Sequence, residues 1–179
     1  MKQAWTTVAA LAVCGSLGLG VKPAAAQGTG LIPVRAKIGV FLPQGDAKDF
    51  AGSTHFNGEI DVSPPNLGQG KFTFTAGYYQ GSENGHKLRM VPITVGRTFA
   101  PPNPVSGVTG NPYFGLGAGP YFLRASGAGA SESKTTIGGF GMAGYQFPNK
   151  FFVEAKYHLA GKVAGISPRG LALMVGRSF

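Results

Sequence analysis

The chain of 179 residues carries little charge for its length, because charged residues make up 13% of it, against about a quarter in typical soluble domains. Its formal net charge of +9 suits nucleic-acid binding, but the basic residues are scattered and form no basic run, which argues against that class. The 30 glycines and 13 prolines oppose long helices, and no segment after residue 26 has the run of about 18 apolar residues that a transmembrane helix requires.

The N-terminal segment has the features of an export signal. Lys2 supplies positive charge, an apolar stretch covers residues 4–21, and Ala24-Ala25-Ala26 offers a small-residue cleavage site. We therefore expect a cleaved signal peptide over residues 1–26 and a single domain over residues 27–179. The alternative is an uncleaved membrane anchor, which the cleavage site and the richness in Ala and Gly disfavour.

Eight segments of alternating character follow this signal. A period of two, with apolar residues on one face and polar or small residues on the other, is that of a β-strand. Each segment is about 8–13 residues long, which suits a tilted strand that crosses a membrane. The segments cover residues 32–42, 54–62, 71–80, 88–99, 112–124, 135–147, 151–159 and 170–179.

The lengths of the connections between the segments predict that the two ends of the barrel differ. An up-and-down barrel with both termini in the periplasm has longer outer loops and short inner turns. The inner connections 63–70 and 148–150 are short, whereas 100–111 is a long exception. The expected outer loops, which contain Gly or Ser and at least one charge, cover residues 43–53, 81–87, 125–134 and 160–169.

Each segment separates an oily face from a polar or small one. In the first segment, Ile38 and Val40 lie opposite Arg35 and Lys37. We expect the oily faces to point to lipid and the polar faces to point into a lumen just wide enough for side chains to fill. The facing of the sixth segment is ambiguous, and Pro92 in the fourth, which lacks a ladder donor, predicts a bulge.

Residues 170–179 predict the strand that closes the barrel. Leu171, Leu173, Val175 and Phe179 form one oily face. A membrane barrel must pair its last strand with its first, because an open strand edge in lipid is very costly. The terminal alternation is therefore expected to be a lipid-facing closing strand rather than the edge of a soluble core.

Two short stretches of the chain echo each other. Residues 95–99 are Val-Gly-Arg-Thr-Phe and residues 175–179 are Val-Gly-Arg-Ser-Phe. Both strands run toward the periplasm in the predicted topology, so Phe99 and Phe179 should lie at the same membrane interface, where aromatic rings are favoured. Arg177 then lies on an oily face and must extend to that interface.

Several motifs carry a resemblance to a known family; they are the signal segment, Ile38-Gly39-Val40-Phe41-Leu42-Pro43, the Gly- and Tyr-rich stretch 113–121, Phe152-Val153-Glu154-Ala155-Lys156-Tyr157 and the terminal Gly176-x-x-Phe179. The chain resembles small bacterial outer-membrane β-barrel proteins of the OmpA/OmpX/OmpW-like superfamily. The resemblance implies an all-β, eight-stranded antiparallel up-and-down transmembrane barrel that is exported to the outer membrane. It also implies that Val175, Gly176 and Phe179 form a closing-strand signal read by the barrel-assembly machinery.

The predicted inward faces carry the candidate site. Buried charges must be paired and hydrogen-bonded, so we expect an ion-pair network that plugs the lumen. The alternative is a polar conduit, in which Gly115, Gly117 and Gly119 leave room for water instead of letting Tyr79 or Tyr113 pack across. The charged residues of this candidate network are Arg35, Lys37, Glu59, Asp61, Glu154 and Lys156.

Catalysis has weak support in the sequence. His55, His86 and His158 show no metal-ligand spacing, and no Ser lies in a nucleophile-elbow motif. Ser53 and His55 share one face of an extended chain, but Glu59 lies about 13 Å farther along and is too distant to orient His55. We expect no enzyme activity, no cofactor and no metal.

The predicted function is that of an outer-membrane barrel with a structural or surface-interaction role. Its expected partners are outer-membrane lipid, the barrel-assembly machinery during biogenesis and a surface partner that the sequence does not identify. A narrow pore for small hydrophobic or ionic solutes is one alternative. A soluble, lipocalin-like periplasmic ligand-binding barrel is another, and it would place the apolar faces inside.

Overall fold

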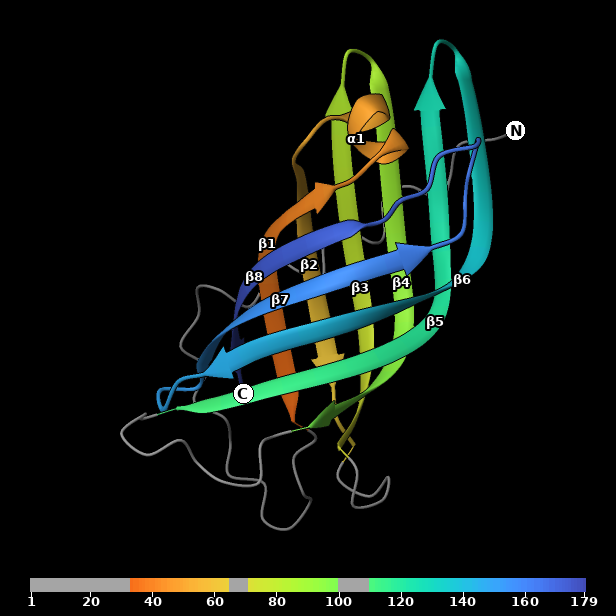
Figure 1. Cartoon of the computed structure of the whole chain (residues 1–179). Coiled ribbons are helices and arrows are strands. Elements are labelled where there is room, and N and C mark those ends of the chain that lie inside the picture. The colour runs from red at the N-terminus through yellow and green to blue at the C-terminus, as the bar shows by residue number, and fades with distance from the viewer. Residues whose placement is uncertain (1–32, 65–70, 100–109) are drawn as a thin grey trace, which may run out of the picture. The chain divides into compact units, whose positions relative to one another are not determined.

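The computed structural model describes residues 33–64, 71–99 and 110–179, and the predicted signal peptide, residues 1–26, lies outside these residues. Within them, eight antiparallel strands form a closed barrel, with one short helix at one end (Figure 1). The predicted fold is confirmed. The elements are β1 Val34–Pro43, α1 Asp46–Ala51, β2 His55–Val62, β3 Lys71–Glu83, β4 His86–Phe99, β5 Asn111–Gly127, β6 Ala130–Gln146, β7 Phe151–Ala160 and β8 Gly170–Ser178.

The barrel closes because β8 pairs with β1. Ile38 lies opposite Val175 and Leu42 lies opposite Leu171, so apolar residues of the two strands stand side by side. The eight described strands follow one another in chain order and leave no open edge, which is the condition for a sheet in lipid. The prediction that residues 170–179 form the closing strand is confirmed.

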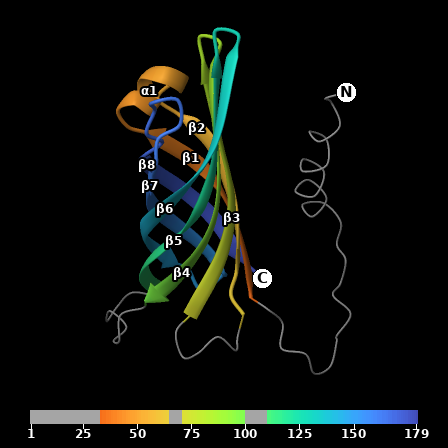
Figure 2. The same cartoon turned by 90° about the vertical axis from the view of Figure 1, so that its right-hand side faces the viewer.

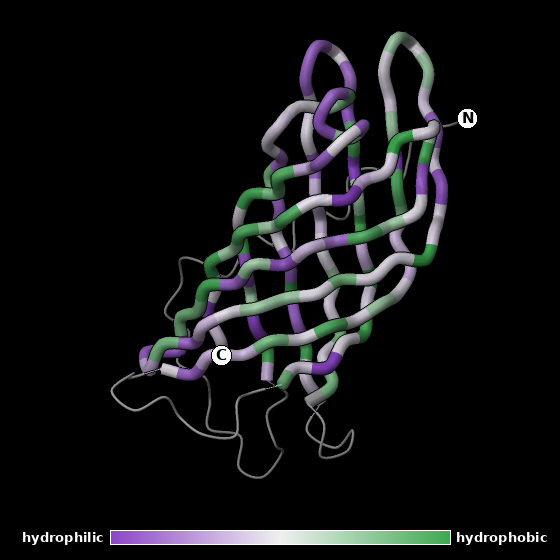
Figure 3. Tube along the Cα trace, viewed as in Figure 1, coloured by the Kyte–Doolittle hydropathy of each residue, from purple (hydrophilic) through white to green (hydrophobic). Residues whose placement is uncertain are grey.

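Residues alternate between the outer surface and the lumen along the strands, and Figure 3 shows this as alternating hydrophobic and hydrophilic positions. Ile38 is 58% exposed and Val175 is 56% exposed, whereas Lys37 is 2% exposed. In β6, whose facing the sequence left open, Phe140 is buried and Ile137 is 76% exposed. Apolar residues cover the outside, so the reversed facing of a lipocalin-like barrel is wrong for this chain.

Pro92 lies in a continuous strand. The pairs Ala76–Ile93 and Tyr79–Met90 keep the same register on the two sides of Pro92, so no residue is inserted into β4. The predicted bulge is therefore wrong. One ladder bond is lost at the proline nitrogen, and the pairing on both sides holds the strand in place without an extra residue.

Two hairpins extend beyond the rest of the barrel at the end where α1 lies, which we call the hairpin end (Figures 1 and 2). They are β3–β4, which turns at Asn84-Gly85, and β5–β6, which turns at Ala128-Gly129, and all four turn residues have positive φ. Two-residue turns of this kind match the twist of paired strands. Residues 81–87 and 125–134 were predicted to be loops, but they are largely strand, because their small and polar residues hide the alternation.

Helix α1 packs on the mouth of the barrel at the hairpin end. Residues 43–53 were predicted to be a loop, yet Ala47 and Ala51 form a buried face of this helix. The short β-bridge between Val163 and Ile166 brings a second segment to the same mouth. No helix among the described residues is long and apolar enough to cross a membrane. Both segments join the barrel strands in one buried apolar cluster, which contains Phe41, Ala47, Ala51, Tyr79, Leu88, Met90, Tyr121, Leu123, Ala125, Val163, Ile166, Ala172 and Met174.

Candidate functional site

Three strands bring charged side chains together inside the lumen. Lys37 comes from β1, Glu59 and Asp61 come from β2, and Glu154 comes from β7. Lys37 Nζ lies 2.8 Å from Glu59 Oε2, 2.9 Å from Asp61 Oδ2 and 2.8 Å from Glu154 Oε1. The ammonium group therefore bridges carboxylates that come from both sides of β1.

Two further cations complete the group. Lys156 Nζ lies 2.5 Å from Glu59 Oε2 and 3.6 Å from Glu154 Oε1. Arg35 Nη2 lies 3.9 Å from Glu154 Oε2. Removing charges from water is costly, and close pairing offsets that cost only when positive and negative groups balance. Three cations here meet three carboxylates, and we call the set the lumen charge network: Arg35, Lys37, Glu59, Asp61, Glu154 and Lys156.

Tyrosine hydroxyl groups satisfy the remaining acceptors of the network. Tyr79 OH donates to Glu59 Oε1 at 2.5 Å. Tyr113 OH donates to Glu154 Oε2 at 2.9 Å and accepts a hydrogen bond from Arg35 Nη2 at 2.6 Å. A buried carboxylate that accepts hydrogen bonds in addition to its ion pairs costs less to bury, because more of its lost hydration is replaced.

His158 lies at the edge of the network toward the hairpin end and connects two tyrosines. Its Nε2 is 2.8 Å from Tyr79 OH and its Nδ1 is 2.9 Å from Tyr121 OH. Tyr79 donates its hydroxyl proton to Glu59, so the Tyr79 oxygen accepts a hydrogen bond from the protonated Nε2 of His158. The other ring nitrogen of His158, Nδ1, is then unprotonated and accepts a hydrogen bond from the Tyr121 hydroxyl. The chain of hydrogen bonds thus runs without a gap from Tyr121 to the carboxylate of Glu59.

A glycine of β5 lets a ring fill the lumen beside the network. A methyl group at Gly117 would lie 2.6 Å from a ring carbon of Phe140 and 2.7 Å from Gly96 Cα. The ring of Phe140 also lies under the Lys156 ammonium, with 4.6 Å between Nζ and the ring centroid. The space beside Gly117 is therefore filled by a phenylalanine of β6. Tyr79 and Tyr113, which the sequence suggested for packing across the lumen, reach His158 and Glu154 of β7 instead of this space.

Arginines at the end opposite the hairpins lie over aromatic rings. The guanidinium of Arg177 lies 5.5 Å from the ring centroid of Phe151 and 5.7 Å from that of Phe179. Arg97 lies 5.2 Å from the ring centroid of Phe99. The repeated Val-Gly-Arg-x-Phe stretches thus place the same arginine–phenylalanine pair at the same end of two strands, which explains how a charge is accommodated on an oily face.

Sequence reasoning placed the six network residues on inward faces, and the structure brings all six together. It missed Thr75, whose Oγ1 donates to Asp61 Oδ1 at 2.8 Å, and the role of Tyr121. Both residues lie on the inward face of their strand, so alternation alone could have found them.

The residues considered for catalysis are not brought together. His55 is buried whereas Ser53 is exposed. Among the described residues, no three His, Cys, Asp or Glu side chains gather to hold a metal.

Comparisons with known proteins show which solved structures share this barrel architecture. No protein-family model matches the sequence, and no curated protein matches it. The structure is similar to that of Neisserial surface protein A (NspA), with a TM-score of 0.66 and 17% identity, over 82% of this chain and 95% of that one. It is also similar to the N-terminal β-barrel domain of Pseudomonas aeruginosa OprF, with a TM-score of 0.51 and 15% identity, over 84% of this chain and 100% of that one.

Identities this low show a shared fold rather than a shared activity. The closed antiparallel barrel, its outward apolar faces and its polar lumen are features of that fold. The chain has the fold of the small eight-stranded outer-membrane β-barrels.

Proposed function

We propose that this chain is an outer-membrane β-barrel protein with a structural or surface-interaction role, whose lumen is plugged by its own side chains. The observation that carries the proposal is the burial of the lumen charge network. The side chains of Lys37, Glu59 and Glu154 are 0% exposed. A solute could pass this level only by separating ion pairs that water does not reach, which is energetically unfavourable.

The apolar cluster at the hairpin end supports the same reading. Phe41, Leu88 and Met90 are buried there beneath α1, on the hairpin side of the charged level. An ion that entered from this side would first have to cross a layer of buried apolar side chains, which cannot replace the water that the ion gives up. Two successive layers, one apolar and one charged, therefore favour a plug over a conduit.

The outer surface supports membrane insertion. Leu116 of β5 is 62% exposed and Leu159 of β7 is 55% exposed, although a soluble barrel would bury residues of this size. Aromatic residues lie toward both ends of the apolar band, such as Phe56 and Tyr78 toward the hairpins and Phe151 at the other end. This is the arrangement of the two membrane interfaces in β-barrels.

Export and assembly complete the proposal. Residues 1–26 act as a signal peptide that is removed, and residues 27–179 form the barrel domain. Val175, Gly176 and Phe179 of the closing strand act as the signal that the barrel-assembly machinery reads. The hairpin end then faces the exterior, where loops and hairpins on such scaffolds meet their partners.

A protein of the same fold also supports a surface role, because NspA is named as a surface protein.

Membrane fractionation with heat-modifiable gel migration tests the placement of the protein. We expect the protein in the outer-membrane fraction, with an unheated form that migrates differently from the boiled form, because a closed barrel resists detergent until it is heated. Recovery in the soluble periplasmic fraction would reject the membrane placement.

Conductance in planar bilayers tests the plug. We expect no steady single-channel steps from the purified barrel, because the lumen charge network blocks the path. An outer-membrane porin serves as the positive control for the bilayers. Steady steps from the purified barrel would reject the plug and support the alternative of a narrow pore for small solutes.

A further inference from the structure

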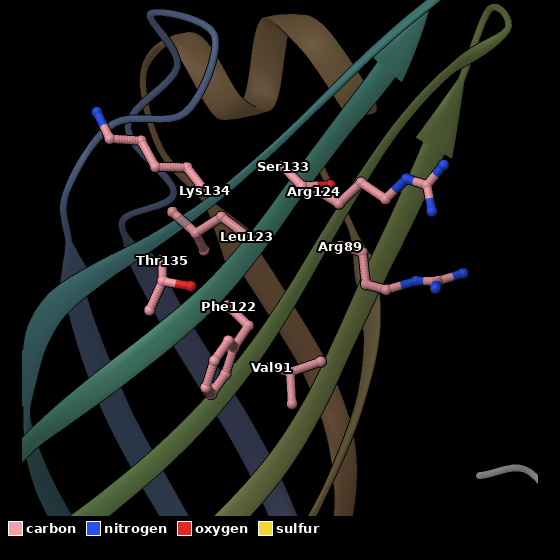
Figure 4. Close-up of a pocket in the computed structure, with 8 residues that line it drawn as sticks. All are labelled: Arg89, Val91, Phe122, Leu123, Arg124, Ser133, Lys134 and Thr135. Atoms are coloured by element: carbon pink, nitrogen blue, oxygen red, sulfur yellow. The ribbon is translucent and has the colours of Figure 1, made fainter. Parts of the chain in front are cut away.

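Two arginines stand next to each other on the outer face of the tall hairpins. Arg89 of β4 pairs in register with Arg124 of β5, and Arg124 pairs with Ser133 of β6. Figure 4 shows both guanidinium groups extending to the same side of the sheet, while Lys134 extends to the other side. The two cations are thus brought together by strand register rather than by a flexible loop.

This pairing is unfavourable without an anion. Like charges directly opposite on neighbouring strands repel. Arg89 donates to the amide oxygen of Gln80, at 3.5 Å, and its guanidinium lies 5.6 Å from the ring centroid of Tyr78, while Arg124 donates to Ser131 Oγ, at 3.3 Å. Neither arginine forms an ion pair with a residue that the structure describes.

The acidic residues of the chain are all placed away from this face. They lie in the lumen, on α1 or on the inward faces of β3 and β6, and they are Asp46, Asp49, Glu59, Asp61, Glu83, Glu132 and Glu154. Lys87, on the same face as Arg89 and one row farther from the barrel centre, adds a further positive charge. The outer face of the hairpins is therefore basic, with no acidic side chain to neutralise it.

A hollow lined by polar and apolar side chains adjoins the arginines. It has a volume of about 270 Å³, and its lining combines apolar side chains, among them Val91 and Phe122, with polar ones that include Arg89, Arg124 and Thr135 (Figure 4). Phe122 is 44% exposed. The next outward residue along β4 is Ile93, which is 50% exposed. From the hairpin tips toward the barrel centre, the surface thus changes from basic to aromatic to aliphatic.

We propose that this surface binds one phosphate-bearing lipid of the leaflet at the hairpin end. The lipid phosphate accepts hydrogen bonds from Arg89 and Arg124, whose planar guanidinium groups suit phosphate oxygens. An acyl chain lies along Val91, Phe122 and Ile93. This inference rests on the proposed membrane placement, which sets the arginine row at headgroup level and the isoleucine in the hydrocarbon region.

A lipid suits the surface better than a free phosphate ion. The arginines are on an open outer face, where salt screens their attraction for a dissolved anion. A lipid adds apolar contact with the hollow and is already concentrated in the same membrane. The headgroup and the acyl chain therefore match the two halves of the surface, whereas a free ion would use only one of them.

A tryptophan reporter makes the site measurable. The only tryptophan of the chain is Trp5, so a Trp5→Phe, Phe122→Trp variant has a single tryptophan, which lies at the hollow. The barrel is reconstituted in phosphatidylcholine bilayers with increasing brominated phosphatidic acid, whose bromine quenches tryptophan. We expect Trp quenching to show a preference of roughly five-fold or more for phosphatidic acid over brominated phosphatidylcholine, since one basic residue near a membrane surface contributes about 1 kcal/mol.

Variants assign the preference to the arginines. Arg89→Gln combined with Arg124→Gln should abolish the preference. Arg97→Gln, which removes an outward arginine from the opposite end of β4, should leave it intact. A reporter at Tyr157, on the outer face of β7, should show no such preference, because it has no arginine pair beside it. Heat-modifiable migration verifies that each variant is folded.

The contrary outcomes are distinct. Equal quenching by both lipids in the parent reporter, or an unchanged preference in the double variant, overturns the lipid site while leaving the membrane placement intact. Loss of phosphatidic-acid quenching on addition of inorganic phosphate, but not of sodium chloride at the same ionic strength, shows a free-anion site and overturns the lipid assignment. Quenching by neither lipid places residue 122 outside the bilayer and overturns the membrane placement itself.

Discussion

Lys37 shows how one buried residue can organise a lumen. Its ammonium touches carboxylates of two other strands, while Lys156 and Arg35 supply the charge that a single lysine could not balance. Each group in this set is costly to bury alone, and the set is stable only when every partner is present. This interdependence therefore makes the barrel sensitive to a single charge deletion.

Replacing Lys37 with methionine tests this dependence. We expect Lys37→Met to lower the free energy of unfolding by about 3–5 kcal/mol, because it leaves buried carboxylates without their shared cation. Denaturant titration of the barrel in lipid vesicles measures the change. The matched control, Lys162→Met, removes an exposed loop lysine and should change stability by less than about 0.5 kcal/mol.

A double variant assigns the loss to the network. Adding Glu154→Gln to Lys37→Met should recover part of the lost stability, because it removes one of the uncompensated charges, and the two effects should not be additive. Purely additive losses, or a Lys37→Met barrel as stable as the control, would show that the network contributes no coupled stabilisation.

At the scale of elements, the packing of β5 against β6 depends on side chains of complementary size at paired positions. Gly117 pairs with Phe140 across the ladder, and the phenylalanine ring occupies the lumen space that the glycine leaves. The long β5–β6 hairpin also carries Arg124 beyond the apolar band, where it meets Arg89 of β4. Strand length thus determines both the filling of the lumen and the position of the basic outer face.

A glycine-to-alanine pair tests the packing of this hairpin. We expect Gly117→Ala to destabilise the barrel by about 1–3 kcal/mol, because the added methyl would lie 2.6 Å from the Phe140 ring and a packed core does not yield easily. Gly141→Ala, on the outer face with no heavy atom within 4 Å of the added methyl, should be neutral. Unfolding midpoints of the two variants give the comparison, and equal midpoints would contradict it.

At the scale of the whole molecule, charge is segregated by the barrel wall. The acidic residues lie in the lumen or near the hairpin end, and the outward charges of the strands, such as Arg97 and Arg177, are basic. An apolar outer band with basic rims suits an anionic membrane surface. Because β8 pairs with β1, the apolar outer band continues around the whole barrel and no strand edge is exposed.

A pair of phenylalanine variants tests whether the closing strand carries an assembly signal. We expect Phe179→Ser to reduce the amount of folded barrel in the outer membrane several-fold. Phe151→Ser, which removes a ring at the same interface, should have a smaller effect. Quantifying the heat-modifiable form in membrane fractions separates the two. Equal reductions would show that Phe179 serves only as an interfacial ring.

Alternation along each strand allowed the facing of most strands to be predicted from the sequence, because successive side chains of a strand point to opposite faces. The inward placement of Lys37 and Glu154, the outward placement of Ile38 and the closing role of residues 170–179 all follow from this local rule. The rule failed where neither face was distinctly oily, as in the Gly-rich sixth segment and at the hairpin tips.

Only the tertiary structure decided which inward residues meet. Glu154 reaches Lys37, which is 117 residues away in the sequence, because closure brings β7 within reach of β1. The row formed by Arg89 and Arg124 depends on the register of two strands, and α1 depends on the barrel mouth against which Ala47 packs. Such contacts arise from register and closure, which are properties of the whole sheet, so a period read along one strand could not reveal them.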